Sequence, residues 1–142
     1  MIAYLDSSAI IKLYLVDEAG MAELRGVATE SAKIATSRLS YVEVRAGLAA
    51  ARRARRLTSK DHDLAVTSFD ASWAGYLVVE LTEAVGSRAG AMAETYGLRA
   101  GDAIQLASVF ELDVEQTVIV AWDGRLRYAS HAAGVATYPI SV

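Results

Sequence analysis

Short apolar runs alternate along the chain with longer segments in which apolar residues recur every three or four positions. The short runs are typical of buried strands and occupy residues 2–5, 34–36, 76–81, 117–121 and 135–138. Helical spacing is found over residues 7–15, 18–30, 60–74, 82–96, 102–113 and 123–133, and in a long segment that begins at Ser40. This alternation predicts an α/β fold, a three-layer sandwich in which helices flank a mostly parallel sheet of four or five strands.

The composition is that of one globular domain, so we interpret residues 1–142 as a single unit. Hydrophobic residues make up 54% and charged residues 22% of the chain, which argues against disorder. The absence of cysteine excludes disulfides, thiolate zinc sites and cysteine nucleophiles. A net charge of −3 is not that of a protein that holds nucleic acid by its overall charge.

The N-terminal segment does not have the features of a secretory signal. It lacks a basic start and a small-residue cleavage site, and Asp6 and Lys12 interrupt its apolar run. No stretch reaches the 18 or so apolar residues of a membrane span. We therefore expect a cytoplasmic protein.

Four acidic residues each lie where a strand or loop gives way to a helix: Asp6, Glu43, Asp102 and Asp123. In a parallel sheet these junctions meet at the edge where such sheets bind ligands. Two carboxylates about 4 Å apart in a partly screened site repel each other by roughly 4 kcal/mol, so a cation is needed to keep them ionised. Mg²⁺ or Mn²⁺, which prefer oxygen ligands, is the expected cofactor.

Helix capping is the ordinary alternative for every one of these acids. Asp6, Asp102 and Asp123 would each cap a helix, and Glu43 would complete an S-x-x-E capping box with Ser40, each contributing about 1 kcal/mol. Capping does not explain why all four occur in this order and context.

The four acids stand in longer segments that carry a family resemblance. The chain resembles the PIN-domain ribonucleases, and within them the VapC-type toxins of toxin–antitoxin pairs. The segments that carry it are Tyr4–Tyr14, Ser40–Leu48, Leu98–Ala107 and Val118–Leu126. One departure is Trp122, which stands where the family usually has a small or polar residue; it would narrow the cleft, stack on a base or pack against a neighbouring helix.

The resemblance implies a function and a set of partners. It implies an Mg²⁺- or Mn²⁺-dependent endoribonuclease in which Asp6, Glu43, Asp102 and Asp123 are the catalytic, metal-binding acids. Ser7 and Ser8 would support them by orienting water or a carboxylate, or would simply cap the helix. The implied partners are an RNA substrate, a second copy of the chain and a small VapB-like antitoxin, with DNA bound only through the antitoxin.

Basic residues are candidates for contacts with RNA or with an acidic partner. Arg52, Arg55 and Arg56 have the spacing of one helix face, and Arg99 precedes Asp102 closely. A solvated helix end with cations near its negative pole is the alternative reading of the first three.

Two other functions remain open. One is a different Mg²⁺-dependent phosphoryl-transfer enzyme in which Asp6 is the nucleophile, although the late lysine that such sites usually need is missing. The other is a non-catalytic PIN domain that acts as a binding module.

Overall fold

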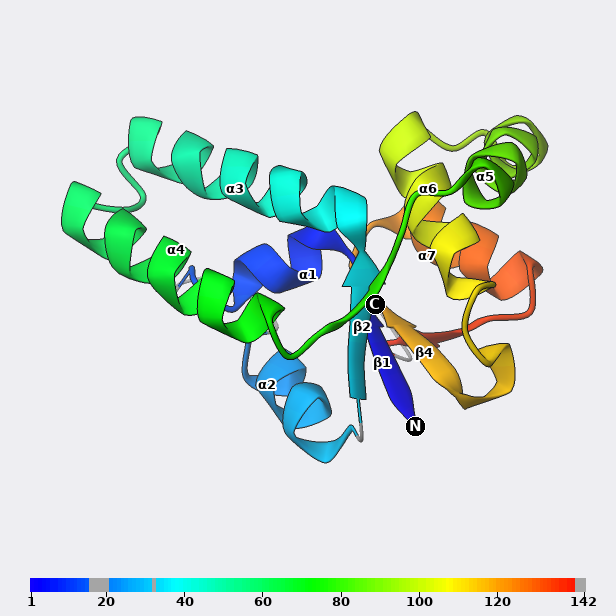
Figure 1. The fold of residues 1–142 in the computed structure, drawn as a ribbon, viewed down its shortest axis with the longest axis horizontal. Coiled ribbons are helices and arrows are strands. Elements are labelled where there is room, and N and C mark those ends of the chain that lie inside the picture. The colour runs from blue at the N-terminus through cyan, green and yellow to red at the C-terminus, as the bar shows by residue number, and fades with distance from the viewer. Residues whose placement is uncertain (16–20, 32, 140–142) are drawn as a thin grey trace.

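Five parallel strands form the centre of the molecule (Figure 1). The structure is a computed structural model that describes residues 1–15, 21–31 and 33–139. The strands are β1 (Ile2–Leu5), β2 (Lys33–Ser37), β3 (Leu77–Val79), β4 (Thr117–Val120) and β5 (Ala136–Tyr138). Their order in the sheet is β3-β2-β1-β4-β5, and every neighbouring pair is parallel.

The central strand β1 is the point at which the chain changes direction across the sheet. After β1 the chain adds β2 and β3 on one side, and it then returns to add β4 and β5 on the other side. In open parallel sheets, ligands bind outside the carboxyl ends of the strands at such a point. The loops that follow β1 and β4 are therefore where a functional site is expected.

Helices cover both faces of the sheet, as Figure 1 shows. On one side lie α1 (Ser7–Lys12), α2 (Met21–Glu30), α3 (Arg38–Arg53) and α4 (Ser59–Trp73). On the other side lie α5 (Glu83–Tyr96), α6 (Ala100–Val109) and α7 (Gly124–Ala132), and a short 3₁₀ helix (Val114–Gln116) precedes β4. The three-layer α/β sandwich predicted from the sequence is confirmed.

Each face of the sheet buries its own hydrophobic core, because successive side chains of a strand point to opposite faces. Tyr4 and Ile119 pack in the core beneath α5, α6 and α7. Leu5 and Val120, their neighbours in sequence, pack in the core beneath α1–α4. On α4, Phe69 is fully buried in this second core, whereas Leu64 is 59% exposed.

Helix starts agree with the sequence predictions at Asp6 and Asp123, the N-caps of α1 and α7. The capping box predicted for Ser40 and Glu43 is wrong, because α3 follows β2 directly and Ser37 is its N-cap. Asp102 is not a cap either: α6 begins at Ala100, which places Asp102 in the first turn. Residues 18–20 of the helix predicted over 18–30 lie outside the described residues, and α2 begins at Met21.

The predicted basic helix face is also corrected by the structure. Helix α3 ends at Arg53, and Arg55 has a left-handed backbone with φ of 61°. The amide of Arg56 donates to the carbonyl of Ala51, which closes the helix in the manner of a Schellman turn. Arg52, Arg55 and Arg56 therefore do not share one helix face, although all three are exposed.

None of the helices in the described segments has the length and apolar character that crossing a bilayer requires.

Candidate active site

Asp6 lies directly after β1 at the change of direction in the sheet, and only 4% of its surface is exposed. Its Oδ1 accepts a hydrogen bond from the Ala9 amide at 2.8 Å, and the Ser8 hydroxyl lies 3.0 Å from both carboxylate oxygens. Burial raises the pKa of Asp6 to about 6, and the charges of Asp102 and Glu43 add to that rise. The two hydrogen bonds oppose the shift but do not cancel it.

Glu43 reaches the same place from α3. Its Oε1 accepts from the Ser7 hydroxyl at 3.1 Å and from the Gln105 amide nitrogen at 3.0 Å. Its Oε2 lies against Gly101 of α6, where a Cβ would stand only 3.1 Å from this oxygen. Helix α3 approaches α1 closely because Gly47 has no side chain; a Cβ there would collide with Ile11. From α3, Glu43 thus contacts residues of both α1 and α6.

Asp102 and Asp123 approach from the opposite helical layer. Burial raises the pKa of Asp102, followed by the charges of Asp123 and Glu43, while Arg99 lowers it. Asp123 is exposed, and its Oδ1 accepts from the Leu126 amide at 2.9 Å as the N-cap of α7. The charges of Asp102 and Glu43 therefore act on Asp6, and the charges of Asp123 and Glu43 act on Asp102.

The chemistry of this group fits a hard divalent cation. Within residues 1–15, 21–31 and 33–139, no three acidic or histidine side chains form a ready-made metal cage. However, the donors are carboxylate oxygens, and desolvation together with like charge raises the pKa of two of them. A cation would reverse that effect, and Mg²⁺ commonly binds through few carboxylates, with water and phosphate as further ligands.

A buried polar network supports the acids, and the sequence did not reveal it. Gln105 is 2% exposed; its Oε1 accepts from the Tyr4 hydroxyl at 2.6 Å, and its Nε2 donates to Ser40 at 3.0 Å. The Ser40 hydroxyl lies 2.7 Å from the Thr36 hydroxyl. The Thr36 hydroxyl donates to the Leu5 carbonyl at 2.7 Å. The feature of the sequence that could have indicated this network is a glutamine, Gln105, within the otherwise mostly apolar run 103–109.

The remaining candidate residues occupy the surroundings of the acids. A groove of about 380 Å³ between α1 and α3 is lined by Ser8, Lys12 and Arg56 together with small and apolar side chains. Trp122 is partly buried and packs against the core beneath α1–α4, with the Lys12 ammonium 5.1 Å from its ring centre. Arg99 is exposed at the N-cap position of α6, close enough to Asp102 to lower its pKa.

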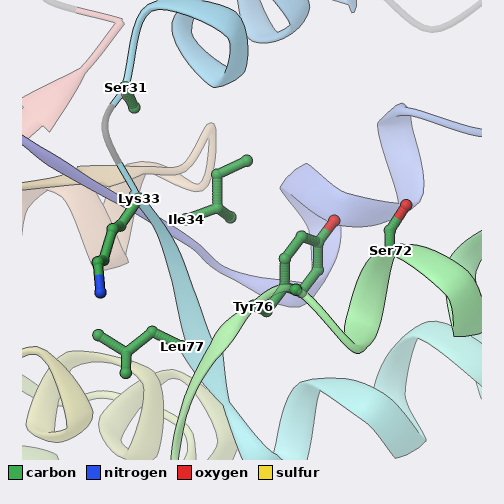
Figure 2. Close-up of a pocket in the computed structure, with 7 residues that line it drawn as sticks. Ser31, Lys33, Ile34, Ser72, Tyr76 and Leu77 are labelled. Carbon is green, nitrogen blue, oxygen red and sulfur yellow. The ribbon is translucent and has the colours of Figure 1, made fainter.

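A second hollow, of about 620 Å³, lies at the amino edge of the sheet, away from the acids (Figure 2). It is formed where β2 and β3 begin, and its lining residues are Ser31, Lys33, Ile34, Ser72, Gly75, Tyr76 and Leu77. Among the described residues that line it there is no carboxylate, so they do not offer the ligands of a hard cation. The candidate active site is therefore at the carboxyl edge.

Comparisons with known proteins identify the family of the chain. The PIN domain family model matches residues 3–131. Ribonuclease VapC45 of Mycobacterium tuberculosis (strain CDC 1551 / Oshkosh) is 38% identical over 138 residues, which cover 97% of this chain and 95% of the relative.

Solved structures show the same fold at lower identity. VapC20 of Mycobacterium tuberculosis, described as a sarcin–ricin loop cleaving toxin, matches with a TM-score of 0.68 at 16% identity over 94% of this chain and 96% of its own. A toxin–antitoxin complex from Klebsiella pneumoniae matches with a TM-score of 0.62 at 17% identity, covering 88% of this chain and 89% of that one. The family model and the 38% identical relative both span nearly all of the chain, which therefore belongs to the PIN-domain family, in its VapC group.

Proposed function

We propose that this protein is a metal-dependent endoribonuclease that hydrolyses RNA phosphodiester bonds with Mg²⁺ or Mn²⁺ as cofactor. The observation that carries the proposal is the buried Asp6 carboxylate at the carboxyl end of β1, whose pKa is raised by burial and by the charges of Asp102 and Glu43. Asp123 completes the acidic group through its effect on Asp102. The name of the 38% identical relative, a ribonuclease, supports the choice of RNA as substrate.

The residues of this chain have distinct tasks in such a reaction. When bound, the cation supplies Lewis-acid stabilisation of phosphate charge and lowers the pKa of water. Asp6 holds it from the end of β1, with its carboxylate oriented by the Ser8 hydroxyl and the Ala9 amide. Glu43, fixed by Ser7, and Asp102 complete the carboxylate set. No side chain has to form a covalent intermediate.

The groove between α1 and α3 offers a path for the RNA strand next to this site. It includes Ser8, whose hydroxyl contacts Asp6, and two cationic side chains, Lys12 and Arg56. Cations at this position neutralise phosphates locally, which a chain of net charge −3 cannot do by its overall charge. We expect Arg56→Gln to weaken RNA binding and reduce its salt dependence, with Arg25→Gln on α2 as the exposed control.

The biological role that we infer is that of the toxin in a toxin–antitoxin pair. The structural relatives include a toxin–antitoxin complex and a toxin that cleaves the sarcin–ricin loop. By analogy, the partners of this chain are a small VapB-like antitoxin and a second copy of itself, in the cytoplasm. Contacts with DNA would come from the antitoxin.

The test compares RNA cleavage and Mn²⁺ binding in the wild type and in Asp6→Asn. Wild-type cleavage should stop in EDTA and return with Mg²⁺ or Mn²⁺, and the variant should fold but cleave at least 100-fold more slowly. Asp61→Asn, which removes an exposed carboxylate on α4, is the matched control. Asp6→Asn cleaving at the wild-type rate would overturn the proposal, and Mn²⁺ binding without any cleavage would favour a non-catalytic binding module.

A further inference from the structure

We propose that Gln105 is a positioning residue that orients the Glu43 carboxylate for metal binding, and that Tyr4 fixes the orientation of the Gln105 amide. This inference rests on the proposed function. It concerns a chain of two hydrogen bonds, from the Tyr4 hydroxyl to Gln105 Oε1 and from Gln105 Nε2 to Glu43 Oε1, of 2.6 and 3.0 Å.

Burial makes this hydrogen-bond chain specific. Tyr4 is fully buried and Gln105 is 2% exposed, so neither side chain can exchange its partner for bulk water. A buried polar group without a partner costs about 1–3 kcal/mol, which keeps both hydrogen bonds formed. Gln105 is thus a fixed part of the wall behind Glu43.

The phenol determines which way the amide faces. A glutamine side chain presents an acceptor on one side and donors on the other, and a rotation of the amide exchanges them. The Tyr4 hydroxyl donates to Oε1, and with the amide in this orientation Nε2 faces Ser40 and Glu43. The reversed amide would place an oxygen against the Glu43 carboxylate and repel it.

The orientation of Glu43 then leaves one oxygen for a cation. Both described hydrogen-bond donors to this carboxylate, Ser7 and Gln105, bind Oε1. The other oxygen, Oε2, lies beside Gly101, where the absence of a side chain leaves room. Groups that orient metal ligands in this way typically change metal affinity 10- to 100-fold when they are removed.

A double-mutant cycle separates positioning from a purely structural role. The variants are Gln105→Met, which keeps the length of the side chain but not its donor, Glu43→Gln, and the combination of the two. Mn²⁺ affinity is measured by calorimetry, folding by urea unfolding and RNA cleavage under single-turnover conditions. Gln116→Met, at an exposed glutamine outside the network, is the control.

We expect Gln105→Met to weaken Mn²⁺ binding at least 10-fold in the wild-type background and less than about 2-fold in the Glu43→Gln background. Tyr4→Phe should weaken it by a smaller factor, because the amide then loses its fixed orientation. Should Gln105→Met fail to fold, Tyr4→Phe and its combination with Glu43→Gln provide the same comparison.

Two outcomes would overturn the inference. One is Mn²⁺ affinity of Gln105→Met within twofold of the wild type, and the other is an equal loss in both backgrounds. Either result, obtained with a wild type that binds Mn²⁺ and cleaves RNA, contradicts only the role of Gln105. A wild type that does neither contradicts the proposed function itself.

Discussion

Replacing Asp6 by asparagine should stabilise the metal-free protein while it abolishes cleavage. Asp6 is buried, and burial together with the charges of Asp102 and Glu43 raises its pKa from 3.8 to about 6. Above that pH the folded protein must keep a desolvated negative charge that the unfolded chain exposes to water. Asparagine has nearly the same shape and retains an oxygen to accept the Ala9 amide, but it carries no charge.

The size of the effect follows from the pKa shift. A rise of about 2 units corresponds to roughly 3 kcal/mol of unfavourable free energy when the group is ionised, at 1.36 kcal/mol per unit. Part of this gain is lost because the amide replaces one carboxylate oxygen near the Ser8 hydroxyl. We therefore expect the free energy of unfolding to increase by about 1–3 kcal/mol at pH 7.5.

The pH dependence has a definite sign. Above about pH 6, Asp6 is ionised in both the folded and the unfolded protein, and the cost is complete. Between about pH 6 and 4 the folded state retains a proton that the unfolded state has lost, so this group makes the wild type more stable as the pH falls. The advantage of Asp6→Asn should accordingly be largest above pH 6 and shrink as the pH falls toward 4.

The assay is urea unfolding in EDTA, followed by the fluorescence of Trp73 and Trp122, at a series of pH values. Saturating Mn²⁺ should reverse the order of stabilities, because only the wild type gains binding energy from the metal. Asp61→Asn should not stabilise the protein: it should lower the free energy of unfolding by no more than about 1 kcal/mol, because its carboxylate lies in the first turn of α4. A wild type that is at least as stable as Asp6→Asn in EDTA at pH 7.5 would refute the reasoning.

Three further substitutions test other features of the structure. Gly101→Ala should displace the Glu43 carboxylate and weaken Mn²⁺ binding, as measured by calorimetry. Gly90→Ala on α5 is the control: its new Cβ meets nothing within 4 Å, so it should only raise the free energy of unfolding by about 0.5–1 kcal/mol. Arg127→Met should lower the free energy of unfolding by roughly 2–3 kcal/mol, because the buried guanidinium donates to two backbone carbonyls. A decrease of less than about 0.5 kcal/mol would contradict this. Arg55→Gly should raise the free energy of unfolding by about 1 kcal/mol, because glycine adopts the left-handed backbone without strain. An unchanged urea midpoint would contradict this strain.

The strands and the acids at their ends could be predicted from the sequence because both signals are local. The run Thr117–Val120 is β-branched throughout, and Asp6 and Asp123 cap the helices that follow their strands. Because β1 and β4 are neighbouring parallel strands, Asp6 and Asp123 lie at the same edge of the sheet.

The partners of Glu43 could not be predicted, because they depend on tertiary contacts. The S-x-x-E pattern indicated a local pair with Ser40, but Glu43 instead accepts hydrogen bonds from residues 36 and 62 positions away, Ser7 and Gln105. Similarly, the spacing of Arg52, Arg55 and Arg56 assumed a continuing helix, and only the structure shows that α3 ends at Arg53.

The acidic group draws its members from both helical layers: Glu43 from the layer of α1–α4, and Asp102 and Asp123 from the layer of α5–α7. The last of these residues follows β4, near the end of the chain. During synthesis a nascent chain cannot complete this set until most of it has left the ribosome exit tunnel. We expect a chain truncated before β4 to be inactive in the RNA cleavage assay, so the translating cell would be exposed to the nuclease only after β4 and Asp123 have been made.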